Sequence, residues 1–515
     1  MARVFVVGLD GATFDLIDPW IGKGELPNLK KIIDGSSYGK LESTIPPISP
    51  PAWASFMTGV NPGRHGIFDF ITFKPNSFEK VLINSSHIRS RRFWDLAGEK
   101  GRKSIILYIP LTYPPQRTEG VMISGIPVPP KGEFIYPREM EAELQENIGT
   151  WWMEIDGDRF RDPDEKALLK EVYRSLGIRF KVADYLMEKD WDLFVLVITE
   201  TDVLQHLLWQ ERDRFLLPLY KKIDEKLGHF MNRLGQEDVV LILSDHGAGP
   251  VRKTLYLNTW LKEKGFLASR KMWVQEKGGT ETSLYPRRKR SSFLERMKQG
   301  FRKRRPVIDW DRTEAYFFDT GQLQGVSVNL KGREPRGRVE PDDYDRVRNR
   351  VIEELYAMVD EEEGRKVIEK VFRREEIYWG PYVKDAPDIV FVPNYEYMIS
   401  SRIRDSLFKR KRDGRGVHRL HGIFILRGPG IKKGRRIESA HIMDMAPTIL
   451  YLLGVPVPKG FDGKVLTDAL ERDRLMTHPI QVEDPSLEVG ASEFDMTEDE
   501  VEEMKKRLRG LQYID

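Results

Sequence analysis

The chain has 515 residues, of which 40% are hydrophobic and 32% are charged, and its formal net charge is +3. This length suggests about three domains, or one large domain with insertions, and the composition suits a large core beneath a charged surface. The nearly balanced charge does not by itself indicate nucleic-acid binding. The absence of cysteine excludes disulfides, zinc–thiolate sites and cysteine nucleophiles.

The apolar runs are too short for a membrane span or a signal peptide. The first of them, Val4–Leu9, passes directly into Asp10, and no run approaches the ~20 apolar residues that a span requires. Together with the absence of cysteine, this favours a cytoplasmic protein. Abundant lysine, arginine and glutamate without cysteine is typical of a thermophile.

The first half of the chain alternates between strand and helix patterns. Short β-branched apolar runs predict strands buried on both faces at Val4–Leu9, Ser104–Tyr108, Leu193–Ile198 and Val239–Leu243. Helical patterns occur at Asp164–Lys189 and Leu219–Leu234. The alternation predicts an α/β fold, with a doubly wound, mostly parallel central sheet and helices on both faces.

The same pattern returns after Tyr316. Residues 342–358 predict a helix, and Asp388–Val392 and Gly422–Leu426 predict further strands, which we expect to complete the same sheet. We therefore predict a discontinuous α/β core over residues 1–267 and 310–475, an inserted cap over 268–309, and a tail over 476–515. The tail contains an amphipathic helix that begins at a capping box of Thr497 and Glu500.

The predicted cap contains a strongly basic segment. Tyr285–Arg305 holds ten lysines and arginines and one acid, Glu295. We expect it to be partly helical, to border the active-site entrance and to steer anionic substrates. The alternatives are a solvated charged loop, or a surface that binds nucleic acid or anionic lipid.

Acidic residues and histidine follow the predicted strands. Asp10 ends the first strand, and Asp245 and His246 close the strand Val239–Leu243. Polar groups at so apolar a strand end are costly to bury unless they are paired or bound to metal. The alternatives are a helix cap or a turn residue for Asp10 and a hydrogen-bonded core histidine for His246. Ligands bind beyond the carboxyl ends of strands in open parallel sheets.

Two further segments offer the same types of ligand. Asp202 and His206 are four residues apart after the strand Leu193–Ile198, a spacing that places both on one face of a helix. They are either a zinc-binding pair or a surface pair. His418 and His421 share the loop before the strand Ile423–Leu426, and either one could be a ligand.

Ser49 is the candidate nucleophile. It precedes two prolines and a helical pattern, so it could lie where helix N–H groups face an anion. A hydroxyl bound to a metal loses its proton more easily and becomes nucleophilic. The alternative is that Ser49 is simply a helix N-cap.

Taken in order, these segments resemble the alkaline phosphatase superfamily, and within it the type I phosphodiesterase and nucleotide pyrophosphatase family. The matching motifs are Gly-Leu-Asp-Gly, Ser-Pro-Pro-Ala-Trp-Ala-Ser-Phe-Met-Thr-Gly, Asn-Pro-Gly-Arg-His-Gly, Asp-x-x-x-His, Ser-Asp-His-Gly and Gly-x-His. The resemblance covers about residues 3 to 468, apart from the basic insertion. It departs from the nucleotide pyrophosphatases at Ser49, where they commonly have threonine, and at Ala52, where they commonly have asparagine.

The resemblance implies roles for these residues. Asp202, His206 and His418 match the ligands of one metal, and Asp10, Asp245 and His246 match those of a second, which Ser49 also approaches. It implies two divalent ions, zinc or alternatively manganese, and hydrolysis through a Ser49 phosphoryl-enzyme intermediate.

The expected function is a phosphodiesterase or nucleotide pyrophosphatase that acts on a small phosphate ester. The alternatives are a phosphomonoesterase or phosphotransferase of the same fold, and a non-catalytic binder of nucleic acid or anionic lipid. Trp53 occupies the place of the arginine that a sulfatase requires, so we set that activity aside.

Overall fold

The computed structural model describes residues 2–129, 131–152, 155, 165–274, 303–318, 324–410, 414–490, 494 and 496–511. Its largest element is a nine-stranded sheet. The strands, in their order across the sheet, are β24 (Arg435–His441), β2 (Ser37–Glu42), β23 (His421–Arg427), β9 (Val239–Leu243), β1 (Val4–Leu9), β8 (Leu193–Ile198), β5 (Ser104–Leu107), β6 (Gly120–Ile123) and β7 (Ile135–Tyr136).

The centre of this sheet is parallel. β1 lies between β9 and β8, and β5 continues the parallel arrangement on the far side of β8. Every residue of β1, β8 and β9 is buried, as continuous apolar runs predict for parallel strands covered on both faces. Their bounds agree with the predicted strands residue for residue.

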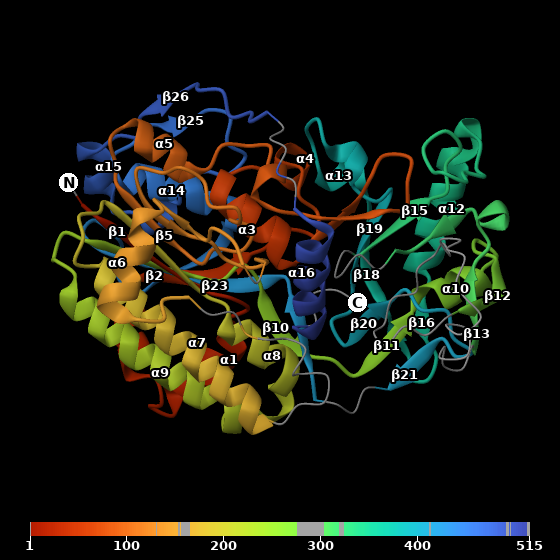
Figure 1. Ribbon diagram of the computed structural model, residues 1–515, viewed down its shortest axis with the longest axis horizontal. Coiled ribbons are helices and arrows are strands. Elements are labelled where there is room, and N and C mark those ends of the chain that lie inside the picture. The colour runs from red at the N-terminus through yellow and green to blue at the C-terminus, as the bar shows by residue number, and fades with distance from the viewer. Residues whose placement is uncertain are drawn as a thin grey trace.

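Helices cover both faces of the sheet (Figure 1). One face carries α1 (Phe14–Gly22), α7 (Glu165–Leu186) and α9 (Arg212–Arg233), and the other carries α3 (Ser49–Thr58), α5 (Phe93–Glu99) and α14 (Met445–Leu452). The predicted doubly wound, mostly parallel α/β fold is therefore confirmed. The parallel strands bring the chain to the same edge of the sheet again and again, and the candidate site lies there.

A second unit lies beside the sheet, at the right of Figure 1, and has its own hydrophobic core. Its four-stranded sheet has the order β14 (Ala315–Tyr316), β15 (Gly325–Val328), β19 (Ile389–Pro393) and β18 (Ile368–Arg373). A three-stranded sheet has the order β20 (Tyr397–Ser400), β11 (Lys253–Tyr256) and β21 (Phe408–Arg410). The helices α10 (Leu257–Glu263) and α12 (Tyr344–Tyr356) belong to this unit.

One strand is not where the sequence places it. The predicted strand Asp388–Val392 forms as β19, but it pairs with β15 and β18 rather than with the nine-stranded sheet. An apolar run predicts a buried strand without specifying its partners, so the sequence could not distinguish the two sheets. The boundaries of the predicted core, cap and tail stay a prediction.

The basic segment is described only at its end. Most of Tyr285–Arg305 lies outside the described residues, including its predicted helical part. Its last three residues begin β13 (Lys303–Ile308), which pairs antiparallel with β12 (Ser269–Val274), a strand that precedes the segment. The amphipathic helix predicted in the tail is confirmed. It forms α16 (Glu498–Gly510), begins at the Thr497–Glu500 capping box, and buries Met504 and Leu508 against the main core.

Candidate functional site

Three acidic residues meet at the carboxyl edge of the sheet. Asp10 follows β1, Asp245 lies two residues beyond β9, and Asp202 lies in α8 (Glu200–Leu208), the helix after β8. Because β9, β1 and β8 are adjacent and parallel, these strand ends lie side by side. All three carboxylates are at most 1% exposed. Gly11, with a φ of +69°, provides the turn beside Asp10.

Asp10, Asp245 and His246 form one compact group. One ligand atom from each residue lies within 4.8 Å of the other two. His246 Nε2 is 3.6 Å from Asp10 Oδ1 and 3.2 Å from Asp245 Oδ2. Its Nδ1 donates to the carbonyl oxygen of Gly247 at 3.0 Å, which leaves the Nε2 lone pair directed at the group.

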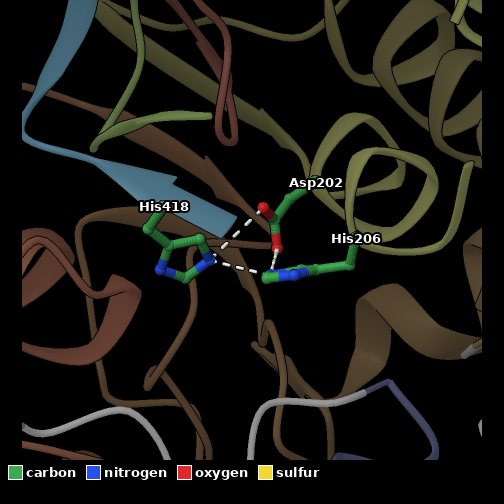
Figure 2. Close-up of side chains that lie close together, drawn as sticks. All are labelled: Asp202, His206 and His418. Carbon is green, nitrogen blue, oxygen red and sulfur yellow. Dashed lines mark hydrogen bonds and ion pairs between the residues drawn. The ribbon is translucent and has the colours of Figure 1, made fainter. Parts of the chain in front are cut away.

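Asp202, His206 and His418 form a second group, in which the side chains point towards one another (Figure 2). Asp202 and His206 face the same side of α8, with His206 Nε2 3.3 Å from Asp202 Oδ2. His418 comes from β22 (Gly416–Arg419) and places Nε2 2.8 Å from His206 Nε2. The alternative of an exposed surface pair is wrong, because both Asp202 and His206 are buried.

The two groups adjoin. β22 pairs with β10 (Gly247–Pro250), and the rings of His246 and His418 stack with centroids 3.6 Å apart. His421 does not take part in either group, because it is exposed at the start of β23. The structure therefore separates the two histidines that the sequence left as alternatives.

Ser49 lies beside His246 of the first group. It is the first residue of α3, and its Oγ is 3.1 Å from His246 Nε2. Since His246 Nδ1 carries a proton, the serine hydroxyl donates to Nε2. The helix-cap alternative is wrong, because the N-cap is Ile48 and no side chain caps this helix.

We expected several free N–H groups at the start of α3 that could face an anion, and the structure does not provide them. Ser49 is followed by Pro50 and Pro51, which have no N–H, and the N–H of Ala52 donates to the carbonyl oxygen of Ile48. The start of this helix therefore offers far fewer donors to an anion than an ordinary helix does.

Three side chains to which the sequence analysis gave no role in the site form hydrogen bonds with Asp10. Trp53 Nε1 donates to Asp10 Oδ2 at 3.2 Å. The Thr201 hydroxyl and the Gln205 amide donate to the Asp10 carbonyl oxygen at 2.6 and 3.5 Å. Thr201 and Gln205 share α8 with Asp202, a proximity that could have drawn attention to them. Trp53 gave no such signal.

Burial and nearby negative charge raise the pKa of both carboxylates of the first group. Burial raises the pKa of Asp10 well above its usual range, and the charges of Asp245 and Asp202 raise it further. Burial and the charge of Asp202 likewise raise the pKa of Asp245 to about 7. A cation placed between these carboxylates would keep both of them ionised.

The histidines respond to the same environment in different ways. Burial opposes protonation of His206, but the adjacent Asp202 carboxylate outweighs it and raises the pKa of His206. Burial lowers the pKa of His246 and of His418 to about 4, so both are neutral at pH 7. Burial also opposes ionisation of Asp202, but the neighbouring His206 and His418 outweigh it and hold the pKa of Asp202 well below its usual range. Neutral imidazole and ionised carboxylate are the states in which these groups bind metal.

The donor set fits two divalent ions. Asp10 Oδ1 and Asp245 Oδ2 are buried, and neither accepts a hydrogen bond from any residue that the structure describes. His206 and His418 each donate Nδ1–H to a carbonyl oxygen, of Gly416 and Pro47, so their Nε2 lone pairs face each other. Two lone pairs 2.8 Å apart repel unless a proton or a cation lies between them.

Known proteins share both the sequence pattern and the fold. The family profile described as type I phosphodiesterase/nucleotide pyrophosphatase matches residues 4–423. No curated protein sequence matches the chain. Among solved structures, human ectonucleotide pyrophosphatase/phosphodiesterase 5 has a TM-score of 0.52 at 14% identity, over 91% of this chain and 99% of that one.

Two other solved structures are similar to the same degree. An inactive variant of murine ectonucleotide pyrophosphatase/phosphodiesterase 5 in complex with AMP has a TM-score of 0.52 at 15% identity, over 92% of this chain and 100% of that one. Phosphonoacetate hydrolase from Sinorhizobium meliloti 1021 in complex with phosphonoacetate has a TM-score of 0.52 at 16% identity, over 88% and 95%. At such identities these likenesses establish the fold.

The family match covers most of the chain and includes all six residues of the two groups of candidate ligands. The chain belongs to the type I phosphodiesterase/nucleotide pyrophosphatase family and is an enzyme of the phosphoester hydrolase type.

Proposed function

We propose that this enzyme cleaves a phosphodiester or a nucleotide pyrophosphate bond, with Ser49 as nucleophile and two divalent metal ions as cofactors. The observation that carries the proposal is the contact of 3.1 Å between Ser49 Oγ and His246 Nε2. This contact puts a buried hydroxyl beside the first group of candidate ligands, whose His246 stacks on His418 of the second group.

The proposed ligands are the two groups already described. Asp202, His206 and His418 would hold one ion, and Asp10, Asp245 and His246 would hold the other. When bound, two such ions stabilise the negative charge on the attacking and leaving oxygens of an in-line displacement. We expect zinc, because imidazole nitrogen and carboxylate oxygen are common zinc ligands, and manganese is the alternative.

The chain's own residues would act in two steps. In the first, Ser49 Oγ forms a bond to phosphorus and releases its proton to solvent, while the bond between phosphorus and the leaving oxygen breaks and that oxygen departs with the electron pair and takes up a proton from solvent. In the second, water attacks the phosphoserine, the bond from Oγ to phosphorus breaks, and Ser49 regains a proton. Gly247 supports both steps by fixing the ring of His246 beside Ser49 through its carbonyl oxygen.

The relatives suggest the class of substrate. One neighbour was solved with AMP and another with phosphonoacetate, so small phosphorus oxyanions are common to this fold. Ala52 supplies no amide where nucleotide pyrophosphatases commonly have asparagine, and Pro50 and Pro51 supply no N–H. The missing amide weakens the case for a nucleotide substrate, and a phosphomonoesterase or phosphotransferase of the same fold is the second candidate.

Binding of nucleic acid or anionic lipid by the basic segment stays a prediction, as do the cytoplasmic location and the thermophilic source. Within the described residues, every helix is too short or too polar to cross a bilayer.

The test is a substrate screen of the purified protein after metal loading. Bis-p-nitrophenyl phosphate, p-nitrophenyl phosphate, a panel of nucleotides and phosphonoacetate separate diesterase, monoesterase, pyrophosphatase and phosphonate-cleaving activity. We expect the diester or a nucleotide to be the best substrate. Chelation should abolish turnover, and zinc or manganese should restore it. Full activity in metal-free protein would contradict the two-metal proposal.

A further inference from the structure

Trp53 lies one helical turn after the candidate nucleophile Ser49 on α3. Ser49 and Trp53 are four residues apart on α3, so both project from the same face of the helix. Trp53 is fully buried, and its ring packs edge-on against Phe56 with centroids 5.4 Å apart. On its other side the ring lies against β1, where a Cβ at Gly8 would come within 2.6 Å of Trp53 Cη2. The indole is therefore tightly confined.

The confined indole donates a hydrogen bond to Asp10. Its Nε1 lies 3.2 Å from Asp10 Oδ2, while Oδ1 of the same carboxylate is 3.6 Å from His246 Nε2. Asp245 is held in a corresponding way. The backbone N–H of Gly11 donates to Asp245 Oδ1 at 3.3 Å, and Oδ2 lies 3.2 Å from His246 Nε2. Each carboxylate thus has one oxygen tied to an N–H and the other directed at His246.

We propose that Trp53 is a positioning residue, whose indole N–H fixes the Asp10 carboxylate so that Oδ1 faces the metal held by Asp10, Asp245 and His246. The inference rests on the proposed two-metal function. Groups that hydrogen-bond to metal ligands orient them, and losing such a partner typically weakens metal affinity about 10- to 100-fold. Because Trp53 also shares a helix face with Ser49, it links the nucleophile to this ligand.

The chain provides a matched control for the loss of an indole. Trp94 is as fully buried as Trp53 and belongs to the same hydrophobic core. Its Nε1 has no acceptor among the described residues. Trp94→Phe therefore removes a similar volume from the same core without removing a hydrogen bond from a candidate ligand.

The experiment titrates metal-free protein with Zn²⁺ in a calorimeter. We expect two binding events in the wild type, and Asp245→Ala identifies the one that belongs to the Asp10 group. Trp53→Phe should weaken this event about 10- to 100-fold and leave the other within about twofold. Trp94→Phe should leave both unchanged. If Trp53→Phe fails to fold, 3-benzothienylalanine at position 53 keeps the ring shape and removes only the N–H.

The possible outcomes distinguish a failure of the positioning role of Trp53 from a failure of the proposed two-metal function. A wild-type protein that binds no divalent ion would overturn both. A wild type that binds two ions, with a Trp53→Phe or benzothienyl variant that binds both as tightly, would overturn the positioning role alone. The positioning role would also be overturned if the Trp53 and Trp94 variants weakened both zinc-binding events to the same extent, because the effect would then come from the loss of packing.

Discussion

Thr201 donates its hydroxyl to the carbonyl oxygen of Asp10 at 2.6 Å. This bond joins the end of β1 to the first turn of α8, which carries Asp202 and His206. Asp10 belongs to the first group of candidate ligands, and Thr201 is adjacent to Asp202 of the second. The bond therefore fixes the main chain of one group relative to that of the other. Thr201 is fully buried, so water cannot replace the bond if the hydroxyl is removed.

Thr201→Val should reduce both stability and activity. Valine keeps the shape of the side chain but leaves the Asp10 carbonyl oxygen without its shortest hydrogen bond, so unfolding should become easier by about 1 to 2 kcal/mol. The value of kcat/KM should fall as well, because the hydrogen bond that fixes the two groups of candidate ligands relative to each other is lost.

Thr58→Val is the control. Its buried hydroxyl donates to the Ala54 carbonyl oxygen at 2.7 Å, away from the site, so only stability should change. Equal kcat/KM in both variants would contradict this role.

Ser49→Ala should lower kcat by several orders of magnitude while the fold and the metal content persist, because the covalent route is lost. Ser55→Ala is a close control, since Ser55 is a second buried serine of α3 and contacts His65 Nε2 at 3.0 Å. It should retain kcat. Quenching wild-type turnover with acid should trap phosphoserine at position 49, detectable by mass spectrometry. An alanine variant that turns over at the wild-type rate would leave direct attack by water as the mechanism.

His418→Ala and His421→Ala should separate the two neighbouring histidines. His418 Nε2 is 3.5 Å from Asp202 Oδ1, so its loss should reduce the bound metal per chain and abolish most activity. His421 is exposed and stands outside both groups, so its loss should change neither. Elemental analysis of metal-loaded protein measures the first effect. The reverse result would move the ligand assignment to His421.

The second unit should lose stability in acid through Asp388. This carboxylate is fully buried, and burial opposes its ionisation. Hydrogen bonds of 2.7 Å from both Nη atoms of Arg333 outweigh burial and hold the pKa of Asp388 below its usual range. A pKa depressed on folding stabilises the protein above the unfolded value of about 4, and that stability disappears as the pH falls through the folded value.

Arg333→Met tests this ion pair. Leaving a buried carboxylate without its main partner should reduce the free energy of unfolding at pH 7 by about 3 kcal/mol. The difference from the wild type should narrow on acidification, because protonated Asp388 no longer needs the arginine. Denaturant unfolding between pH 3 and 8 measures it. A difference that stays constant over this range would show that Arg333 acts through packing alone.

The sequence by itself determined the central strands and every candidate ligand except the choice between His418 and His421. β1, β8 and β9 are short, uninterrupted apolar runs rich in β-branched residues that end at polar residues, and such runs favour a strand buried on both faces. Asp202 and His206 were predictable as neighbours because helical spacing alone places them on one face. The order of these motifs was also enough to indicate the family.

The tertiary structure decided what depends on partners distant in the sequence. Trp53 meets Asp10 across 43 residues, and an indole gives no signal of which acceptor it will find. His418 and His421 are three residues apart in an extended stretch, so they face opposite sides, and only the pairing of β22 with β10 decides which one faces the site. β19 was recognisable as a strand, but its partners were not, because hydrogen bonding between strands depends on the backbone and therefore leaves no trace in the side chains.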